Sequence, residues 1–529
     1  MSKKHEIIFE TDGRHSSVYL YEPPMGIRQY VEPIDEVLDL GFDTISYVVG
    51  DCAVLLYDTK VGEIWGHNYD LVNHEVWYKA AFNCQMMIES GHDPLQVVCD
   101  HAHERGFNFL AHLLLNMAYT PPDRVTNGRV ATFNTLHPEW IVGEEPDYPE
   151  AVHDNPNRMS YAVPEIRENR LAIVRELVTD YPTDGIELNF NTYMPLIARR
   201  EVEEHTETIT EWMRDVRRAA DAAAEAQGRS KRVVVRMAAS VEGNLKMGQD
   251  IKTWVGEGLV DTIVAMPVGG DFSSETARLR ELVEMAEGNG VPVLAGMDSV
   301  GTDQTRLTHR AATVNAYDAG AKGVMYHRYY PPPHRYPYST EDTDRMRLAA
   351  FPDLLAHKDK TFYVGPGFDR RDAVSFGLTD QLPRELTAGE QGPDITIDVS
   401  DDIAGKAEAG ELWRCELRIM LHELVHHDEY RVYWNGEEVP ESRIRRADWV
   451  FQMRPSAGVR GYRLHIDLRN VSLPVKGTNT VRVDLVSKDE QLVDPVSIHD
   501  IDIVVEYLPH RNALRDEESY AGAAVPFTP

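Results

Sequence analysis

Hydrophobic positions along the chain follow two different periods. Between about residues 25 and 350, short β-branched and apolar runs alternate with longer segments in which apolar residues recur every three to four positions. Beyond about residue 360, apolar and polar positions alternate, and turn residues separate the runs. The first pattern predicts a parallel sheet with covering helices, and the second predicts an antiparallel β domain. We expect a (β/α)8 TIM barrel over residues 1–358, an all-β sandwich over 359–510 and a C-terminal extension over 511–529.

The pattern locates seven strands of the barrel. One helix is expected to begin near Pro164 and to end before Pro182, and the next to end at Gly228, a typical helix cap. The seven strands lie within residues 42–51, 107–117, 184–190, 231–240, 260–269, 291–300 and 322–330. Closure of the barrel requires an eighth strand. We expect it within residues 118–160, where RVATFN (129–134) is the candidate.

Six alternating runs predict the strands of the sandwich. The step WNGEE in the third run is a favourable hairpin turn, because Asn-Gly adopts the backbone angles that such turns require. The runs are DITIDVSD (394–401), CELRIML (415–421), EYRVYWNGEEV (429–439), YRLHIDLRNV (462–471), NTVRVDLVS (479–487) and IHDIDIVVEYL (498–508).

Polar residues stand where the barrel strands end. The βα loops form the open face of a parallel barrel, so strand-end side chains are the first place to look for a site. Carboxylates, amides, histidine and arginine suit a ligand with many hydroxyl groups, and a tyrosine offers a face for a sugar ring. The candidate substrate-binding residues are Asp51, His112, Asn116, Asn189, Asn191, Arg236, Asp271, His327, Arg328 and Tyr329.

Two strand-end acids could face each other across the barrel mouth. Cleavage of a glycosidic bond needs two carboxyl groups, one to protonate the leaving oxygen and one to act as nucleophile or as base for water. Our hypothesis gives Glu187 the role of general acid and Asp298 that of nucleophile or base, with Glu242 and Asp271 in reserve. Alternatively, such residues cap helices or pair with an arginine, and Arg236 either pairs with Glu187 or binds a substrate carboxylate.

Several segments resemble a known family. They are HPEW (137–140), RMSYAVPEIRENRLAIVRELVTDYPTDGIELNFN (158–191), WVGEGLVDTIVAMPV (254–268) and GAKGVMYHRYY (320–330). In this order they resemble bacterial glycoside hydrolases of the glycosyl-hydrolase-like family ten, over most of residues 25–345. The resemblance implies a TIM barrel that hydrolyses an oligosaccharide or glycoconjugate with strand-end acids. The sandwich resembles the β-rich accessory modules of such barrels.

Two features keep other functions open. Many relatives have DGIELD where this chain has DGIELN, and Asn189 in place of an acid favours a catalytically silent, carbohydrate-binding barrel. The segment HELVH, from His422 to His426, matches a zinc-peptidase signature. That signature needs a helix and a third ligand, whereas this segment lies among strand patterns. We therefore expect no metal and no cofactor.

Composition narrows the class of partner. The chain has 529 residues, a hydrophobic fraction of 42% and a formal charge of −32, which disfavours binding to nucleic acid or to anionic membranes. No apolar run approaches a membrane span or a signal peptide. Four cysteines without paired spacing are expected to be buried thiols. We expect a cytoplasmic protein that binds carbohydrate, and a homo-oligomeric assembly stays open.

Overall fold

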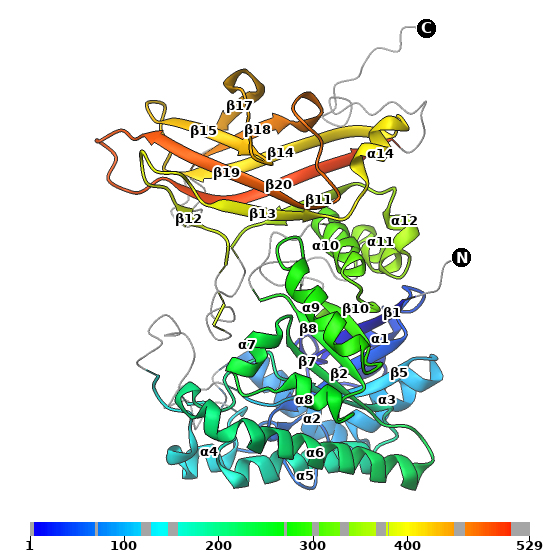
Figure 1. Ribbon diagram of the computed structural model, residues 1–529. Coiled ribbons are helices and arrows are strands. Elements are labelled where there is room, and N and C mark those ends of the chain that lie inside the picture. The colour runs from blue at the N-terminus through cyan, green and yellow to red at the C-terminus, as the bar shows by residue number, and fades with distance from the viewer. Residues whose placement is uncertain are drawn as a thin grey trace, which may run out of the picture.

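The computed structural model consists of a barrel and a β-sandwich stacked on it (Figure 1). It describes residues 5–68, 74–117, 128–145, 157–268, 272–298, 306–327, 338–366, 380–448 and 461–508, together with residues 72, 329, 377 and 378. Statements about structure below refer to these residues.

Eight parallel strands close the barrel. Each strand pairs with its neighbours in parallel, and β1 pairs with both β10 and β2, which joins the two ends of the sheet. A short hairpin, β3 (Val54–Leu55) and β4 (Glu63–Ile64), extends from the end of β2. The barrel strands are β1 (Glu6–Thr11), β2 (Thr44–Asp51), β5 (Asn108–Leu114), β6 (Gly185–Asn189), β7 (Arg232–Ala238), β8 (Thr262–Met266), β9 (Val293–Asp298) and β10 (Gly323–His327).

The eighth strand is not where the sequence pattern placed it. β1 precedes the first helix, whereas the candidate segment 129–134 runs into the short helix α4 (Thr132–Leu136). The sequence EIIFET of β1 lies outside the repeating strand and helix pattern, and its partners β2 and β10 are far away along the chain. The prediction of an eighth strand within 118–160 was therefore wrong for 129–134, because closure comes from the N-terminus.

Helices cover the outside of the barrel. As expected, α5 begins at Pro164, and α6 ends before Gly228, whose φ of 64° is the left-handed value that favours glycine. The covering helices are α1 (Ile27–Asp35), α2 (Glu75–Glu89), α3 (Pro94–Glu104), α5 (Pro164–Thr179), α6 (Val202–Gln227), α7 (Val241–Lys246), α8 (Ile251–Gly256), α9 (Thr276–Glu287), α10 (Arg306–Asp318), α11 (Thr340–Ala349) and α12 (Pro352–Leu355).

An apolar layer fills the middle of the barrel. Successive side chains of a strand point to opposite faces, so alternate residues point into the barrel. The inward residues of this layer form a separate buried cluster: Ile8, Leu110, Val234, Val264, Met266, Leu294 and Met325. The next inward positions towards the C-terminal ends of β1, β5, β7 and β10 are polar: Glu10, His112, Arg236 and His327. The barrel thus has an apolar plug beneath a polar layer, and it is not a pore.

The C-terminal domain is a sandwich of two antiparallel sheets. One sheet has the order β11-β20-β14-β18-β17, with β12 also paired to β20, and the other has the order β13-β19-β15-β16. All six predicted runs contain strands, and the predicted hairpin turn has Asn435 and Gly436 at positive φ. The strands are β11 (Lys360–Val364), β12 (Arg384–Glu385), β13 (Asp394–Val399), β14 (Leu412–His422), β15 (Glu429–Trp434), β16 (Glu437–Glu438), β17 (Ile444–Asp448), β18 (Gly461–Asp467), β19 (Gly477–Ser487) and β20 (Ser497–Tyr507).

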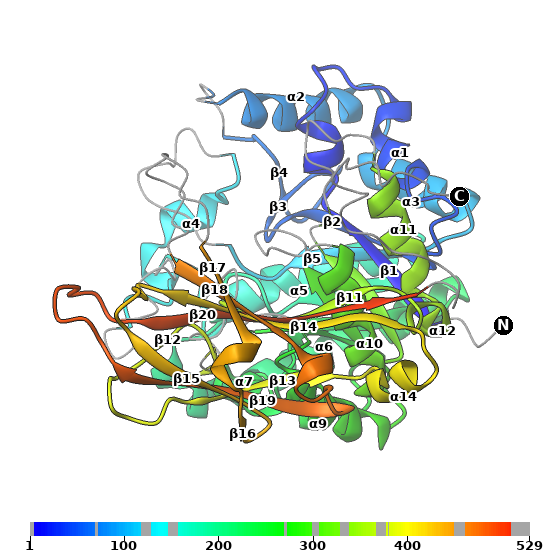
Figure 2. The same cartoon turned by 90° about the horizontal axis from the view of Figure 1, so that it is seen from above.

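The sandwich packs against α10 of the barrel, and the short helix α14 (Ile403–Glu408) lies at its edge (Figure 2). Ala311 of α10 belongs to the hydrophobic core of the sandwich. Asn315, one turn further along α10, donates from Nδ2 to the carbonyl of Asp398 (2.9 Å) and accepts from the backbone of Ser400 (3.0 Å). A fixed hydrogen-bonded contact therefore joins the two domains.

Candidate active site

Five of the predicted site residues meet in the polar layer of the barrel. His112 lies on β5, Glu187 and Asn189 on β6, Arg236 on β7 and His327 on β10. Four of the five are 0% exposed, and His327 is 7% exposed. They come together because they occupy inward positions of neighbouring strands.

Glu187 is bound by two neighbours in the middle of β6. Its Oε1 accepts from Arg236 Nε at 2.6 Å and lies 2.6 Å from Arg236 Nη2, and its Oε2 accepts from the hydroxyl of Ser46. A buried carboxylate of this kind needs such partners, because an isolated charge inside a protein is costly. The structure therefore contains the Glu187–Arg236 pair that the sequence left as one of two alternatives.

A second buried carboxylate, Glu10 of β1, shares the same arginine. Glu10 Oε2 lies 3.4 Å from Arg236 Nη1 and contacts Nδ1 of His327, which also contacts Arg236 Nη1. Burial would raise the pKa of Glu10, but His327 and Arg236 outweigh it and hold the pKa well below its usual range. Glu10 is therefore ionised at neutral pH and is a poor proton donor.

Asn189 fixes the protonation of His112. The backbone amides of Asn191 and Thr192 donate to Oδ1 of Asn189 at 2.9 and 3.1 Å, which identifies that atom as the oxygen. The amide nitrogen Nδ2 then donates to Thr192 Oγ1 (3.0 Å) and to His112 Nε2 (3.2 Å). Burial lowers the pKa of His112 to about 4, in agreement with a neutral ring that carries its proton on Nδ1. Nδ1 lies 3.9 Å from Glu10 Oε1.

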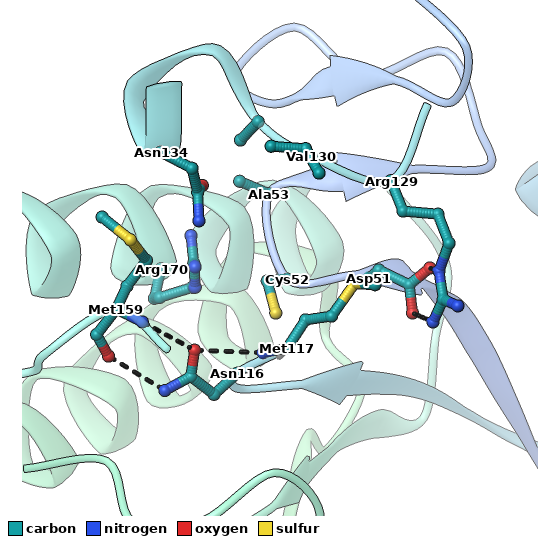
Figure 3. A pocket seen from close by; sticks show the side chains of 11 residues that line it. Asp51, Cys52, Ala53, Asn116, Met117, Arg129, Val130, Asn134, Met159 and Arg170 are labelled. Atoms are coloured by element: carbon teal, nitrogen blue, oxygen red, sulfur yellow. Dashed lines mark hydrogen bonds and ion pairs between the residues drawn. The ribbon is translucent and has the colours of Figure 1, made fainter. Parts of the chain in front are cut away.

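A pocket lies beside the polar layer, above the ends of β2 and β5 (Figure 3). Its empty volume, part of it open to solvent, is about 280 Å³. Asp51 lines it and accepts from Arg129 Nε (2.8 Å) and from Arg14 Nη1 (3.0 Å to each oxygen). Burial would raise the pKa of Asp51, but the two arginines lower it. The lining residues are Asp51, Cys52, Ala53, Asn116, Met117, Arg129, Val130, Ala131, Asn134, Met159 and Arg170.

The other predicted residues lie apart from the polar layer. Asn116 lines the pocket but binds the backbone of Met117 and Met159. Asn191 begins the loop after β6, where its backbone binds Asn189. Tyr329 packs 5.9 Å from the ring of Tyr338 and donates to Asp342, so its face is covered and cannot stack on a sugar.

The reserve acids do not strengthen the site. Glu242 is exposed on α7 and pairs with Lys246 at 2.7 Å. Asp271 and Arg328 lie outside the described residues, as does the side chain of Asp298. The backbone of Asp298 ends β9 in register with His327, which puts this residue at the C-terminal edge of the barrel.

Glu10 and Ser46 were missed from the sequence. Both sit on inward positions and are in register with each other on β1 and β2. A signal existed for Glu10, because it follows Ile8 by two residues in EIIFET and so shares its face. Because β1 was not predicted as a barrel strand, the alternation could not indicate that Glu10 points into the barrel.

The HELVH segment has no zinc-site geometry. His422 ends strand β14, Glu423 has a φ of 57°, and the chain continues as a loop, so His422 and His426 do not share a helix face. In the described ranges, no group of three His, Cys, Asp or Glu side chains is arranged to hold a metal ion.

All four cysteines are buried free thiols, as expected. No helix of the described chain is long and apolar enough to cross a membrane.

The chain therefore forms a closed TIM barrel with carboxylates, histidines and an arginine at its C-terminal face, followed by a β-sandwich. Residues 16–246 match the family model described as Glycosyl hydrolase-like 10. The match includes Asp51, His112, Glu187, Asn189 and Arg236. No curated protein matches the chain.

Solved structures of lower similarity were also found. The α-L-fucosidase isoenzyme 2 from Paenibacillus thiaminolyticus is 12% identical with a TM-score of 0.40, and the alignment covers 67% of this chain and 50% of that one. An α-amylase from Lactobacillus plantarum is 12% identical with a TM-score of 0.37, covering 90% and 98%. A family GH18 N-acetylglucosaminidase from Paenibacillus barengoltzii is 12% identical with a TM-score of 0.33, covering 65% and 99%. The chain thus spans about half the length of the fucosidase.

Proposed function

We propose that this protein is a glycoside hydrolase that cleaves an oligosaccharide or glycoconjugate. The observation that carries the proposal is the polar layer around Glu187, which stands at the C-terminal face of a barrel in a glycosyl hydrolase-like family. Asp298, at the edge of the same face, supplies the second carboxyl group. We further propose a cytoplasmic location, supported by four cysteines that are all buried thiols.

The ion pair of Glu187 supports a change in the roles of the two acids. A carboxylate that accepts from Arg236 and Ser46 is suited to attack the anomeric carbon or to take a proton from water, and poorly suited to donate one. We therefore assign Glu187 as nucleophile or base and Asp298 as the acid that protonates the leaving oxygen. Hydrolysis retains the anomeric configuration if the two carboxyl groups are about 5 Å apart, and it inverts the configuration if they are about 6.5 to 9.5 Å apart.

The test is hydrolysis of a panel of aryl glycosides and natural oligosaccharides, followed as released reducing sugar. Glu187→Gln and Asp298→Asn should each lower kcat at least about a hundredfold. Asp184→Asn is the matched control, because Asp184 lies at the opposite end of β6 and binds Arg229 (2.8 Å) and the backbone of Phe109 (2.7 Å). Asp184→Asn should keep its kcat even if it is less stable.

An aryl glycoside with a good leaving group separates the two roles. It needs little protonation, so it should recover activity in Asp298→Asn but not in Glu187→Gln. Recovery in Glu187→Gln alone would restore the opposite assignment. Hydrolysis that survives both substitutions in folded protein would contradict the proposed site.

A silent carbohydrate-binding barrel is the second candidate. It is favoured by the burial of Glu187 and Glu10, which are 0% and 2% exposed and both already paired. Paired and covered acids also occur where a network only holds a barrel together. Thermal stabilisation by one sugar of the panel, with no release of reducing sugar from any of them, would identify this function.

A further inference from the structure

Arg170 is a buried cation that has no acidic partner among the described residues. It lies on α5, is 1% exposed and lines the pocket above β2 and β5. Its Nε donates to the carbonyl of Leu115 (3.3 Å) and its Nη1 to Oδ1 of Asn169 (2.5 Å), and both acceptors are neutral. No carboxylate in the described part of the chain forms an ion pair with it. Buried charges in proteins are normally paired, so this guanidinium calls for a negative partner that the described residues do not supply.

The remaining neighbours of Arg170 do not balance its charge. The ring of Phe133 lies 5.6 Å from the guanidinium carbon. Burial raises the pKa of the neighbouring Cys52 thiol to about 12, and burial also raises the pKa of Tyr161. Both groups are therefore neutral near pH 7. In Figure 3, Arg170 and Asp51 lie on opposite sides of Cys52, and the dashed contacts of Asp51 run to Arg129.

The described charged groups at the pocket sum to one positive charge, in a strongly acidic protein. Both oxygens of Asp51 are bound by Arg14 and Arg129, and Arg14 also pairs with Asp12 at 3.2 Å. These two aspartates offset two arginines, which leaves the charge of Arg170. The whole chain carries a formal charge of −32, which repels anions in general. A local cation in this pocket would select an anionic group that is small enough to enter it.

The pocket stands further towards the open face of the barrel than the polar layer. His112 lies within β5, which ends at Leu114, and Asn116 of the pocket lies two residues beyond that end. We propose that the pocket binds the carboxylate of an acidic sugar in the glycan, with Arg170 as its main partner. The proposal rests on the proposed function, because it names the substrate class as a carboxylate-bearing glycan.

Binding of single sugars tests the site without any need for turnover. The probes are sodium D-glucuronate, D-glucose and D-glucose 6-phosphate at matched ionic strength, measured by calorimetry and thermal unfolding. Wild-type protein should bind glucuronate at least about ten times more tightly than glucose, because a charge-assisted pair with arginine is a strong hydrogen bond. Arg170→Gln should lose this preference. Arg175→Gln should keep it, because Arg175 is exposed on the same helix.

Each outcome decides the proposal. Equal affinities for glucuronate and glucose, a preference that survives in Arg170→Gln, or a preference for the phosphate alone would overturn it. If Arg170→Gln does not fold, Arg170→Lys takes its place, and it should bind glucuronate more weakly than wild type because it loses the two-pronged contact. Preference for glucuronate without hydrolysis of any glycan would support the pocket and reject the glycosidase, so the two failures are distinguishable.

Discussion

The sequence resemblance implies an acid at the position of Asn189, and Asn189→Asp tests the effect of that acid on His112. The substitution replaces the amide nitrogen, 3.2 Å from His112 Nε2, with a carboxylate oxygen. The two backbone amides that bind Oδ1 remain, and the hydroxyl of Thr192 can turn its proton towards the new oxygen. The new anion therefore faces the ring nitrogen, which must bind a proton to keep a hydrogen bond.

The size of the effect follows from the short distance. A negative charge within about 4 Å raises a histidine pKa by about 1 to 3 units. The pKa of His112, about 4 in the wild type, should rise to between about 5 and 7 in Asn189→Asp. The ring would then bind a proton near neutral pH, where the wild-type ring is neutral.

The same substitution should change how stability depends on pH. Below the unfolded pKa of 6.5, the unfolded chain binds a proton at His112 that the folded chain does not bind. The free energy of unfolding of the wild type should therefore fall by about 3 kcal/mol as pH drops from 6.5 through 4. In Asn189→Asp the two pKa values move closer together, and the loss should shrink to about 2 kcal/mol or less.

The assay is a pH titration of the histidine ring resonances by NMR, with urea unfolding at pH 5 and 7. The chain has 21 histidines, so the signal of His112 is assigned from the spectrum of His112→Gln. Asn191→Asp is the matched control, because it adds the same charge two residues away with no hydrogen bond to His112. If His112 titrates at the wild-type pH in Asn189→Asp, or shifts equally in Asn191→Asp, the assigned contact is refuted.

Two further substitutions test the buried charges. Asp51→Asn leaves Arg14 and Arg129 without their shared carboxylate. Urea unfolding should show a free energy of unfolding lower by about 3 to 5 kcal/mol. A loss below about 1 kcal/mol would contradict the stabilising role of the Asp51 ion pairs. Burial raises the pKa of Asp502 on β20 to about 7. The folded chain therefore keeps a proton on Asp502 that the unfolded chain releases above about pH 4. As a result, the free energy of unfolding falls as pH rises from about 4 through 7. Asp502→Asn should therefore be more stable than wild type at pH 8, by up to about 4 kcal/mol, and equal to it near pH 4; an unchanged pH profile would reject the shift.

Strand alternation is the reason that much of the polar layer could be predicted. Glu187 and Asn189 share a face because they are two residues apart in DGIELNF, and parallel pairing brings His112 and Arg236 to the same end of the barrel. The alternation fails where a strand ends. Tyr329, two residues beyond β10, turns to the outside and packs against Tyr338, which a rule for strand residues cannot foresee.

Arg170 was missed although the sequence contains a signal for it. Ile166, Arg170, Ile173 and Leu177 follow the spacing of one helix face, and all four are buried. An arginine at an inward position of an apolar stripe is unusual and should prompt a search for its partner. The sequence alone does not reveal the surroundings of Arg170, because the pocket is lined by residues from the ends of β2 and β5 and from the segment 129–134, which meet only in the folded chain.

The balance of charge separates the two polar regions of the barrel mouth. In the polar layer, Glu187 and Glu10 have Arg236 and His327 as partners, so the layer needs no outside ion and can rest on the apolar plug beneath it. In the pocket, Arg170 has only neutral acceptors. A ligand that brought a negative charge to the polar layer would meet two carboxylates, whereas in the pocket it would meet Arg170, which forms no ion pair with any described residue. The acidic group of a substrate should therefore lie at Arg170 and leave a neutral sugar over the polar layer, where we propose that the glycosidic bond is cut.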